Sequence, residues 1–168
     1  TLIEAIGDPL VHIVRNSLDH GLEGPQERTA NGKGEQGTLS IKAFHEAGKV
    51  VILIEDDGRG IDPQKIGAKA LSSGILSESE LQLMSEKNII NLIFKPGFST
   101  AEEVTDISGR GVGMDVVQNS LITLGGTVDL SSKVNMGTKL KISLPLTLAI
   151  MPSLLVGIAD STYALPQV

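Results

Sequence analysis

The chain has 168 residues, enough for one compact domain and a short appendage but too few for two full domains. Hydrophobic residues make up 40% of it, which excludes an intrinsically disordered sequence. The net charge of −6 and the aromatic content of 2% argue against a nucleic acid partner, because phosphates need a basic surface and bases stack on aromatic rings. The chain contains no cysteine, which excludes disulfides, thiolate zinc sites and a cysteine nucleophile.

One uncharged stretch, residues 142–159, has to be weighed as a membrane span. Pro145 and Pro152 interrupt it, and the apolar residues alternate from Thr138 onward, which indicates a buried strand followed by a linker. No basic-then-apolar signal peptide opens the chain. We therefore expect a cytoplasmic protein that is not inserted in a membrane.

The first predicted element is a helix over residues 2–20. Its apolar residues at helical spacing predict one buried face: Leu10, Ile13, Val14 and Leu18. Asp8-Pro9 has the pattern of an N-cap followed by proline at the first helical position, which predicts a break or kink. Residues 21–37 are polar and rich in glycine, and we expect them to form a loop.

Strand and helix patterns alternate after this loop. In chain order we expect a hairpin of strands 38–45 and 50–56, a turn at 57–63, helices over 63–72 and 78–94, a glycine- and serine-rich loop over 95–113, a helix over 114–124, and a hairpin of strands 127–132 and 138–146. Gly125-Gly126 ends the last helix. Residues 154–159 and 162–165 have the pattern of a further hairpin.

The first candidate site is Asp56-Asp57-Gly58-Arg59-Gly60, directly after an apolar strand. A carboxylate at the end of a strand can accept a hydrogen bond from an exocyclic amine. Glycine at positions 58 and 60 lets the backbone approach a flat ring closely. Taken alone, these residues are explained more simply by a turn that only needs positive φ.

The second candidate site is Gly109-Arg110-Gly111-Val112-Gly113, immediately before the helix that begins at Met114. Free N–H groups at the start of a helix form an anion site. The spacing is G-x-G-x-G after a long loop, which excludes a Rossmann fingerprint, and the Walker A sequence is absent. A phosphate site and a flexible hinge remain the two interpretations.

The third candidate site is a polar stripe on one side of the first helix: His12, Asn16, Asp19 and His20. The amide oxygen of Asn16 is a hard ligand of the kind that Mg²⁺ accepts. Arg15 offers a planar fork for phosphate oxygens, and Lys65 and Lys69 add charge from a later helix. A solvated helix face and ordinary surface lysines are the alternatives.

These motifs, in this order, resemble the boxes of the GHKL superfamily of ATP-binding domains. The matching segments are His12-x-x-x-Asn16, Asp56-x-Gly58-x-Gly60, Phe94 to Phe98, Gly109-x-Gly111-x-Gly113 and Gly137-Thr138. Stretches such as DPLVHIVRNSLDHGLE and SGRGVGMDVV are similar to the CheA class of chemotaxis histidine kinases, and the likeness runs from about residue 4 to 150. The tail from Met151 resembles the first strands of the CheA regulatory domain.

The resemblance implies an α/β fold: a two-layer sandwich of a mixed, mostly antiparallel sheet with helices on one face, lacking the family's first helix and strand. It implies two parts, an ATP-binding kinase domain at 1–147 and the incomplete start of a CheW-like regulatory domain at 148–168. It also implies a nucleotide-responsive lid over about Pro96 to Arg110.

The resemblance further implies a site for ATP and Mg²⁺, with His12 and Asn16 as catalytic residues and Asn16 as the metal ligand. Asp56 would accept from the adenine amine, and Thr138 would assist through a water. The full set implied to bind ATP is Arg15, Asn16, Asp19, His20, Asp56, Gly58, Gly60, Lys65, Lys69, Phe98, Ser99, Gly109, Arg110, Gly111, Val112, Gly113, Met114 and Thr138.

The implied reaction is phosphoryl transfer from ATP to a histidine on a separate phosphotransfer domain, in bacterial chemotaxis two-component signalling. The implied partners are the coupling protein CheW with chemoreceptors, the response regulators CheY and CheB, and a second kinase copy through a domain absent here. Hydrolytic members of the superfamily carry a glutamate where this chain has His12, which favours transfer over hydrolysis. An ATP hydrolase and a catalytically silent nucleotide-binding module remain as alternatives.

Overall fold

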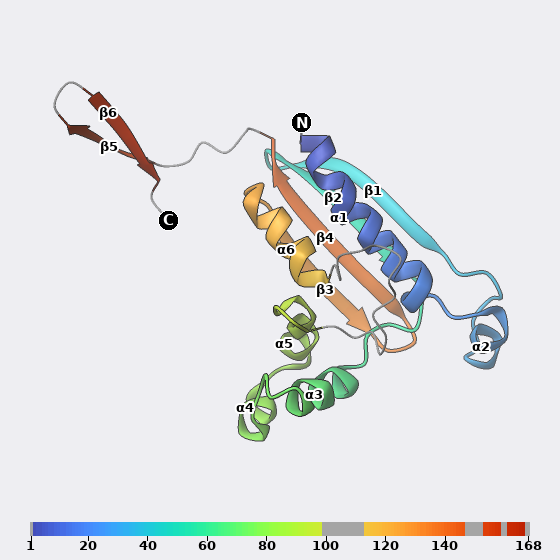
Figure 1. Cartoon of the computed structure of the whole chain (residues 1–168). Helices are drawn as coiled ribbons and strands as arrows, with labels where there is room; N and C mark the ends of the chain where they lie inside the picture. Colours follow the sequence, from blue (N-terminus) through green and yellow to red (C-terminus); the bar gives the residue numbers. More distant parts are fainter. Residues whose placement is uncertain (1, 99–112, 147–152, 159–160, 167–168) are drawn as a thin grey trace.

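The computed structural model describes residues 2–98, 113–146, 153–158 and 161–166. Figure 1 shows the arrangement of the elements. The helices are α1 (Leu2–Asn16), a π-helical turn η1 (Ser17–Gly21), α2 (Pro25–Ala30), α3 (Pro63–Ser72), α4 (Glu78–Leu83), α5 (Glu86–Ile90), a 3₁₀ turn η2 (Asn91–Phe94) and α6 (Met114–Thr123). The strands are β1 (Leu39–Glu46), β2 (Lys49–Asp56), β3 (Thr127–Lys133), β4 (Gly137–Pro145), β5 (Ser153–Ile158) and β6 (Ser161–Pro166).

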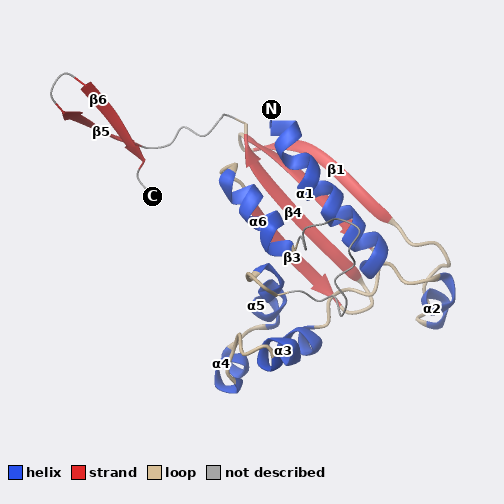
Figure 2. Cartoon of the chain, viewed as in Figure 1, coloured by secondary structure: helices blue, strands red, loops and turns tan. Residues whose placement is uncertain are grey.

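Four strands form one sheet in the order β1-β2-β4-β3, and all three pairings are antiparallel. Ala47 and Gly48, with φ of 49° and 75°, join β1 to β2 in the left-handed geometry of a two-residue hairpin turn. Helices α1 and α6 cover one face of this sheet (Figure 2). The expected α/β sandwich of two layers is therefore confirmed, and β5 and β6 form a separate two-stranded sheet (Figure 1).

The core lies between the sheet and these helices. Alternate residues of β4 are buried, with Leu140, Ile142 and Leu144 exposed by 4%, 1% and 0%. They belong to the same buried cluster as Val117 and Leu121 of α6. The start of the uncharged stretch at 142–159 is thus a core strand, and no described helix is long and apolar enough to cross a membrane.

The first helix departs from the prediction in two ways. It runs through Pro9 without a break, so the predicted break at Asp8-Pro9 is wrong. Ile13 is buried at 5% exposure and Leu10 packs against the core, as expected, but Leu18 is 54% exposed and does not belong to the buried face. The side of the helix that faces the core carries the buried Pro9 and Ile13 with the half-buried Ile6 and Leu10, and Leu18 lies off this side.

Two other segments also differ from the prediction. The stretch 21–37, expected as a loop, contains helix α2, which Pro25 begins and which buries Arg28. The stretch 78–94, expected as one helix, forms α4, α5 and η2. Ser77 caps α4 in a capping box with Glu80, and Ser85 caps α5, so a new helix start interrupts the segment.

Candidate functional site

Asp56 is the centre of a hydrogen-bond network at the end of β2. Its Oδ1 accepts from the backbone N–H groups of Gly58 and Thr138, both at 3.1 Å. Its Oδ2 accepts from the Ser17 hydroxyl at 3.1 Å. A carboxylate has about four acceptor positions, so the bonds from described residues leave one position open on Oδ2. The half-buried carboxylate is held in one orientation and can accept a hydrogen bond from one more donor.

The two glycines that follow Asp56 are required by the packing of three chain segments. A Cβ at Gly58 would overlap the carbonyl of Gly21. Gly60 has a φ of 69°, and a Cβ there would overlap the carbonyl of Lys133. These contacts hold the turn between η1 and the β3–β4 hairpin, whether or not a flat ligand also approaches it.

Ser132 joins this turn to the paired strands. Its hydroxyl accepts from the N–H of Ile61 at 2.8 Å and donates to the carbonyl of Gly137 at 2.9 Å. The Ser132 hydroxyl also lies 3.0 Å from the hydroxyl of Thr138. Thr138 is the residue of β4 that pairs with Asp56 of β2. The structure thus brings Thr138 and Asp56 together as expected. Sequence reasoning missed the contribution of Ser132, whose position in β3 carries no motif.

The π-helical turn η1 brings the end of α1 to Asp56. The N–H of Leu22 donates to the carbonyl of Ser17 at 2.8 Å, five residues back, which widens the turn. Ser17 then reaches Asp56, and the Gly21 carbonyl accepts from the N–H of Arg59 at 2.8 Å. Sequence reasoning missed Ser17 and Gly21, since only their place beside Asn16 and His20 points to them.

Asn16 lies where α1 meets α6. Its amide nitrogen donates to the Met114 sulfur at 3.4 Å, and the side chain is half-buried. The amide oxygen is then the group available to a hard cation such as Mg²⁺. Within the part of the chain that the structure describes, no three His, Asp or Glu side chains gather to hold a metal. Mg²⁺ suits this arrangement because it usually takes few protein ligands and is completed by substrate phosphates and water.

His12 lies one turn before Asn16 and is half-buried. Burial, and then the positive charge of Arg15, lower the pKa of His12 from its ordinary value of 6.5. The imidazole is therefore neutral at pH 7.

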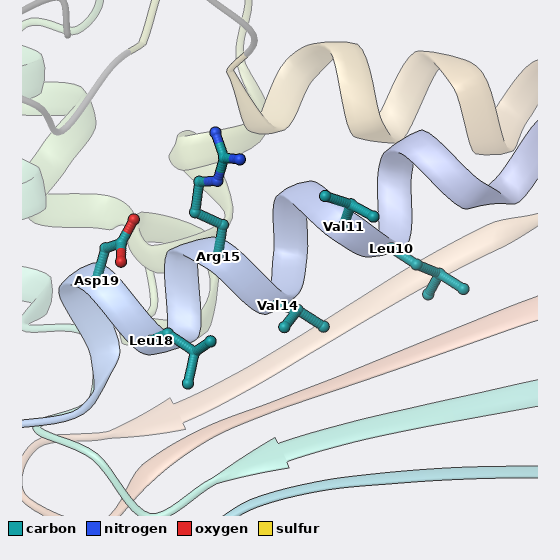
Figure 3. A pocket seen from close by; sticks show the side chains of 6 residues that line it. All are labelled: Leu10, Val11, Val14, Arg15, Leu18 and Asp19. Atoms are coloured by element: carbon teal, nitrogen blue, oxygen red, sulfur yellow. The ribbon is translucent and has the colours of Figure 1, made fainter. Parts of the chain in front are cut away.

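Arg15 and Asp19 line a different part of the helix surface, a shallow hollow of about 430 Å³. Figure 3 shows Leu10, Val14 and Leu18 on one side of the helix and the charged side chains of Arg15 and Asp19 on the other. Asp56 is not part of its lining. The hydrogen bonds of the Asp56 carboxylate within the described part of the chain go to Ser17, Gly58 and Thr138, and not to Arg15 or Asp19.

The remaining predicted residues are spread more widely. Lys65 and Lys69 lie on α3, whose first turn is capped by Asp62. Phe98 is only 4% exposed and packs in the hydrophobic core, so it anchors the chain there. Gly113 is the N-cap residue of α6, and no side chain caps that helix. Five predicted residues lie outside the described part of the chain: Ser99, Gly109, Arg110, Gly111 and Val112.

A cluster of four charged residues lies behind the Asp56 turn, and sequence reasoning missed it: the buried Glu23 and Arg28, with the more exposed Lys33 and Asp57. Burial acts to raise the pKa of Glu23, but hydrogen bonds from Lys33 and the backbone, with the charges of Lys33 and Arg28, lower it overall. Burial likewise opposes the hydrogen bonds and charges on Asp57, and its pKa is also lowered. Both carboxylates are therefore ionised at neutral pH.

Comparison with known proteins places the chain in a family. Residues 5–148 match the family described as histidine kinase-, DNA gyrase B- and HSP90-like ATPase, and the chain belongs to that family. It is 49% identical over 166 residues to a chemotaxis protein CheA of Bacillus subtilis, and 48% identical over 166 residues to a sensor histidine kinase CheAY of Helicobacter pylori. The matches cover 99% of this chain but only 25% and 21% of those relatives.

The chain was also compared with solved structures. A histidine kinase domain from a blue-light activated histidine kinase of Erythrobacter litoralis superposes with a TM-score of 0.46 and 18% identity. That match covers 84% of this chain and 43% of the solved one.

Proposed function

We propose that this chain binds ATP with Mg²⁺ and transfers the γ-phosphoryl group to a histidine of a phosphotransfer domain in bacterial chemotaxis signalling. The observation that carries the proposal is the environment of Asp56. Three hydrogen bonds fix its carboxylate at the end of β2, and one acceptor position on Oδ2 stays open. An adenine amine is a donor of the right kind for that position.

The groups that would hold the phosphates lie at the junction of α1 and α6. Asn16 offers an amide oxygen to Mg²⁺, and Gly113 leaves the first N–H groups of α6 without a side-chain cap. Mg²⁺ would neutralise phosphate charge and help to fix the phosphates in place. His20, Lys65 and Lys69 would add positive or polar groups, and the glycines at 109–113 would complete the phosphate contacts.

The chemistry itself asks little of the protein beyond positioning. A ring nitrogen of the partner histidine forms a bond to the γ-phosphorus, the bond to the bridging oxygen breaks, and ADP leaves. His12 lies one helical turn before Asn16, which supports a place for its neutral imidazole near the reacting groups. Unlike a glutamate, it provides no carboxylate to activate water. This favours transfer to a protein histidine over hydrolysis.

The names of the relatives support the signalling context. Several are chemotaxis proteins named CheA, and by analogy we propose CheW, chemoreceptors, CheY and CheB as partners of the full-length protein, acting as a homodimer in the cytoplasm. In this proposal residues 1–147 bind ATP, and residues from 148 onward, including the β5–β6 hairpin, begin a regulatory domain.

Incubation with γ-labelled ATP, with and without a phosphotransfer domain from a related CheA, tests the proposal. We expect label on the histidine of that domain and little free phosphate. Free phosphate without labelled protein would support the alternative of an ATP hydrolase. Nucleotide binding with neither product would support a silent binding module, and both results would contradict the proposal.

A further inference from the structure

The four charged residues behind the Asp56 turn are joined to one another by ion pairs and hydrogen bonds. The side chains of Arg28 and Glu23 are only 2% and 0% exposed, and they pair at 3.1 Å. Lys33 donates to the other oxygen of Glu23 at 2.7 Å. Asp57 accepts both arms of Arg28, at 3.1 and 2.9 Å. Two cations and two anions balance, so the cluster is neutral.

Lys33 and Arg28 of this cluster also donate hydrogen bonds to backbone carbonyls next to Asp56. The ammonium of Lys33 donates to the carbonyls of Asp57 and Gly58, at 2.9 and 2.7 Å. With its bond to Glu23, all three Lys33 protons are used. Arg28 also donates to the Asp57 carbonyl at 3.3 Å, and the Asp57 carboxylate accepts from the N–H of Thr38 at 2.8 Å. The peptide groups on either side of Gly58 are thereby fixed from behind.

Stability alone does not account for this arrangement. A buried ion pair is expensive to desolvate, and apolar residues of similar volume often stabilise a fold equally well or better. Apolar residues would not fix the direction of the Asp57 and Gly58 carbonyls. That direction matters because the N–H of Gly58 is one of the three donors that orient the Asp56 carboxylate.

We infer that Glu23, Arg28, Lys33 and Asp57 are positioning residues for adenine selection. They hold the Gly58 N–H on Oδ1 of Asp56, so that Oδ2 presents its open acceptor position toward the ring's amine. None of the four contacts the nucleotide. The inference rests on the proposed binding of adenine at Asp56 and adds a set of residues on which selectivity for the amine depends.

Comparing the affinities of two ligands that differ only in the amine tests this role directly. Purine riboside triphosphate has hydrogen where ATP has the amine, and both carry the same ribose and phosphates. The ratio of their affinities isolates the bond to Asp56. A cluster that merely stabilised the fold would change both affinities together and leave the ratio unchanged.

Two substitutions, each made in the full 168-residue chain, remove different bonds of the cluster. Arg28→Lys keeps the charge and removes the two-armed contact with Asp57. Asp57→Asn keeps the shape at a side chain that is 45% exposed, so this variant is expected to fold even if Arg28→Lys does not. The matched control is Glu27→Gln, which breaks the exposed pair of Glu27 with Arg59, 3.2 Å apart, on the same helix α2.

The affinities for both triphosphates are measured by calorimetry with Mg²⁺, with folding checked by circular dichroism. We expect the unmodified chain and Glu27→Gln to prefer ATP by about tenfold or more, the value of a hydrogen bond to a charged acceptor. We expect the preference to fall below about threefold in Arg28→Lys and Asp57→Asn. A folded variant of either kind that keeps the full preference overturns the inference. No preference in the unmodified chain overturns instead the proposed contact between adenine and Asp56.

Discussion

Asp56→Asn is the sharpest single change at the candidate site, because it replaces one oxygen by nitrogen and keeps the shape of the side chain. The asparagine oxygen can still accept from the N–H groups of Gly58 and Thr138, which lie 3.1 Å from Oδ1. The new amide nitrogen takes the place of Oδ2. The Ser17 hydroxyl can rotate to accept from it, since a hydroxyl is both donor and acceptor. An adenine amine cannot accept a hydrogen bond from this nitrogen, because the amine acts only as a donor at this position.

The expected loss follows from that mismatch. A hydrogen bond to a charged acceptor contributes about 1.5–3 kcal/mol, so the affinity for Mg-ADP should fall about 10-fold to 150-fold. Calorimetric titration measures it, and the melting temperature should change little. Asp129→Asn is the matched control, since Asp129 is exposed on β3 and pairs only with Lys87 among the described residues. Equal affinity in Asp56→Asn and the unmodified chain would remove Asp56 from the adenine pocket.

Three further changes test other parts of the site. Asn16→Ala should abolish the rise of nucleotide affinity with Mg²⁺ concentration, and Asn119→Ala on the exposed side of α6 should keep it; an unchanged metal dependence in Asn16→Ala would make this residue structural only. His12→Gln should flatten the pH dependence of stability. Because the folded-state pKa of His12 lies below 6.5, the unfolded chain binds the proton first, and stability falls as the pH drops below 6.5. Urea unfolding at pH 7.5 and 5.5 shows this, and parallel losses in both proteins would contradict it. Gly60→Ala should lower the free energy of unfolding by more than the about 1–2 kcal/mol expected from left-handed strain, because the new Cβ also overlaps the Lys133 carbonyl. Gly74→Ala is the control, since it has a similar φ of 67° and open space; equal costs would show that the overlap is relieved freely.

The strands and the Asp56 turn could be predicted because their signals are local. A continuous run of apolar, largely β-branched residues predicted the strand at 50–56, and β2 covers Lys49–Asp56. A carboxylate at its end, followed by spaced glycines, marked the turn before any contact was known. The pairing of Asp56 with Thr138 follows from the antiparallel register of β2 and β4.

The charged cluster of Glu23, Arg28, Lys33 and Asp57 could not be predicted because its signal is not local. Glu23, Arg28 and Lys33 lie in a polar, glycine-rich stretch and are residue types that are mostly exposed. Their burial depends on Asp57, 29 residues beyond Arg28, which accepts both arms of the guanidinium. The wide turn η1 was missed for the same reason, since the Ser17 hydroxyl bonds to Asp56, 39 residues further along the chain.

The central claim is that an adenine nucleotide lies with its amine on Asp56 and its phosphates toward Asn16 and α6. A crystal structure of the chain with ADP and Mg²⁺ tests this most directly. We predict the adenine amine within hydrogen-bond distance of Asp56 Oδ2, and the Asn16 amide oxygen on the metal. A nucleotide seated elsewhere, such as in the hollow beside Leu10 and Leu18, would contradict the account.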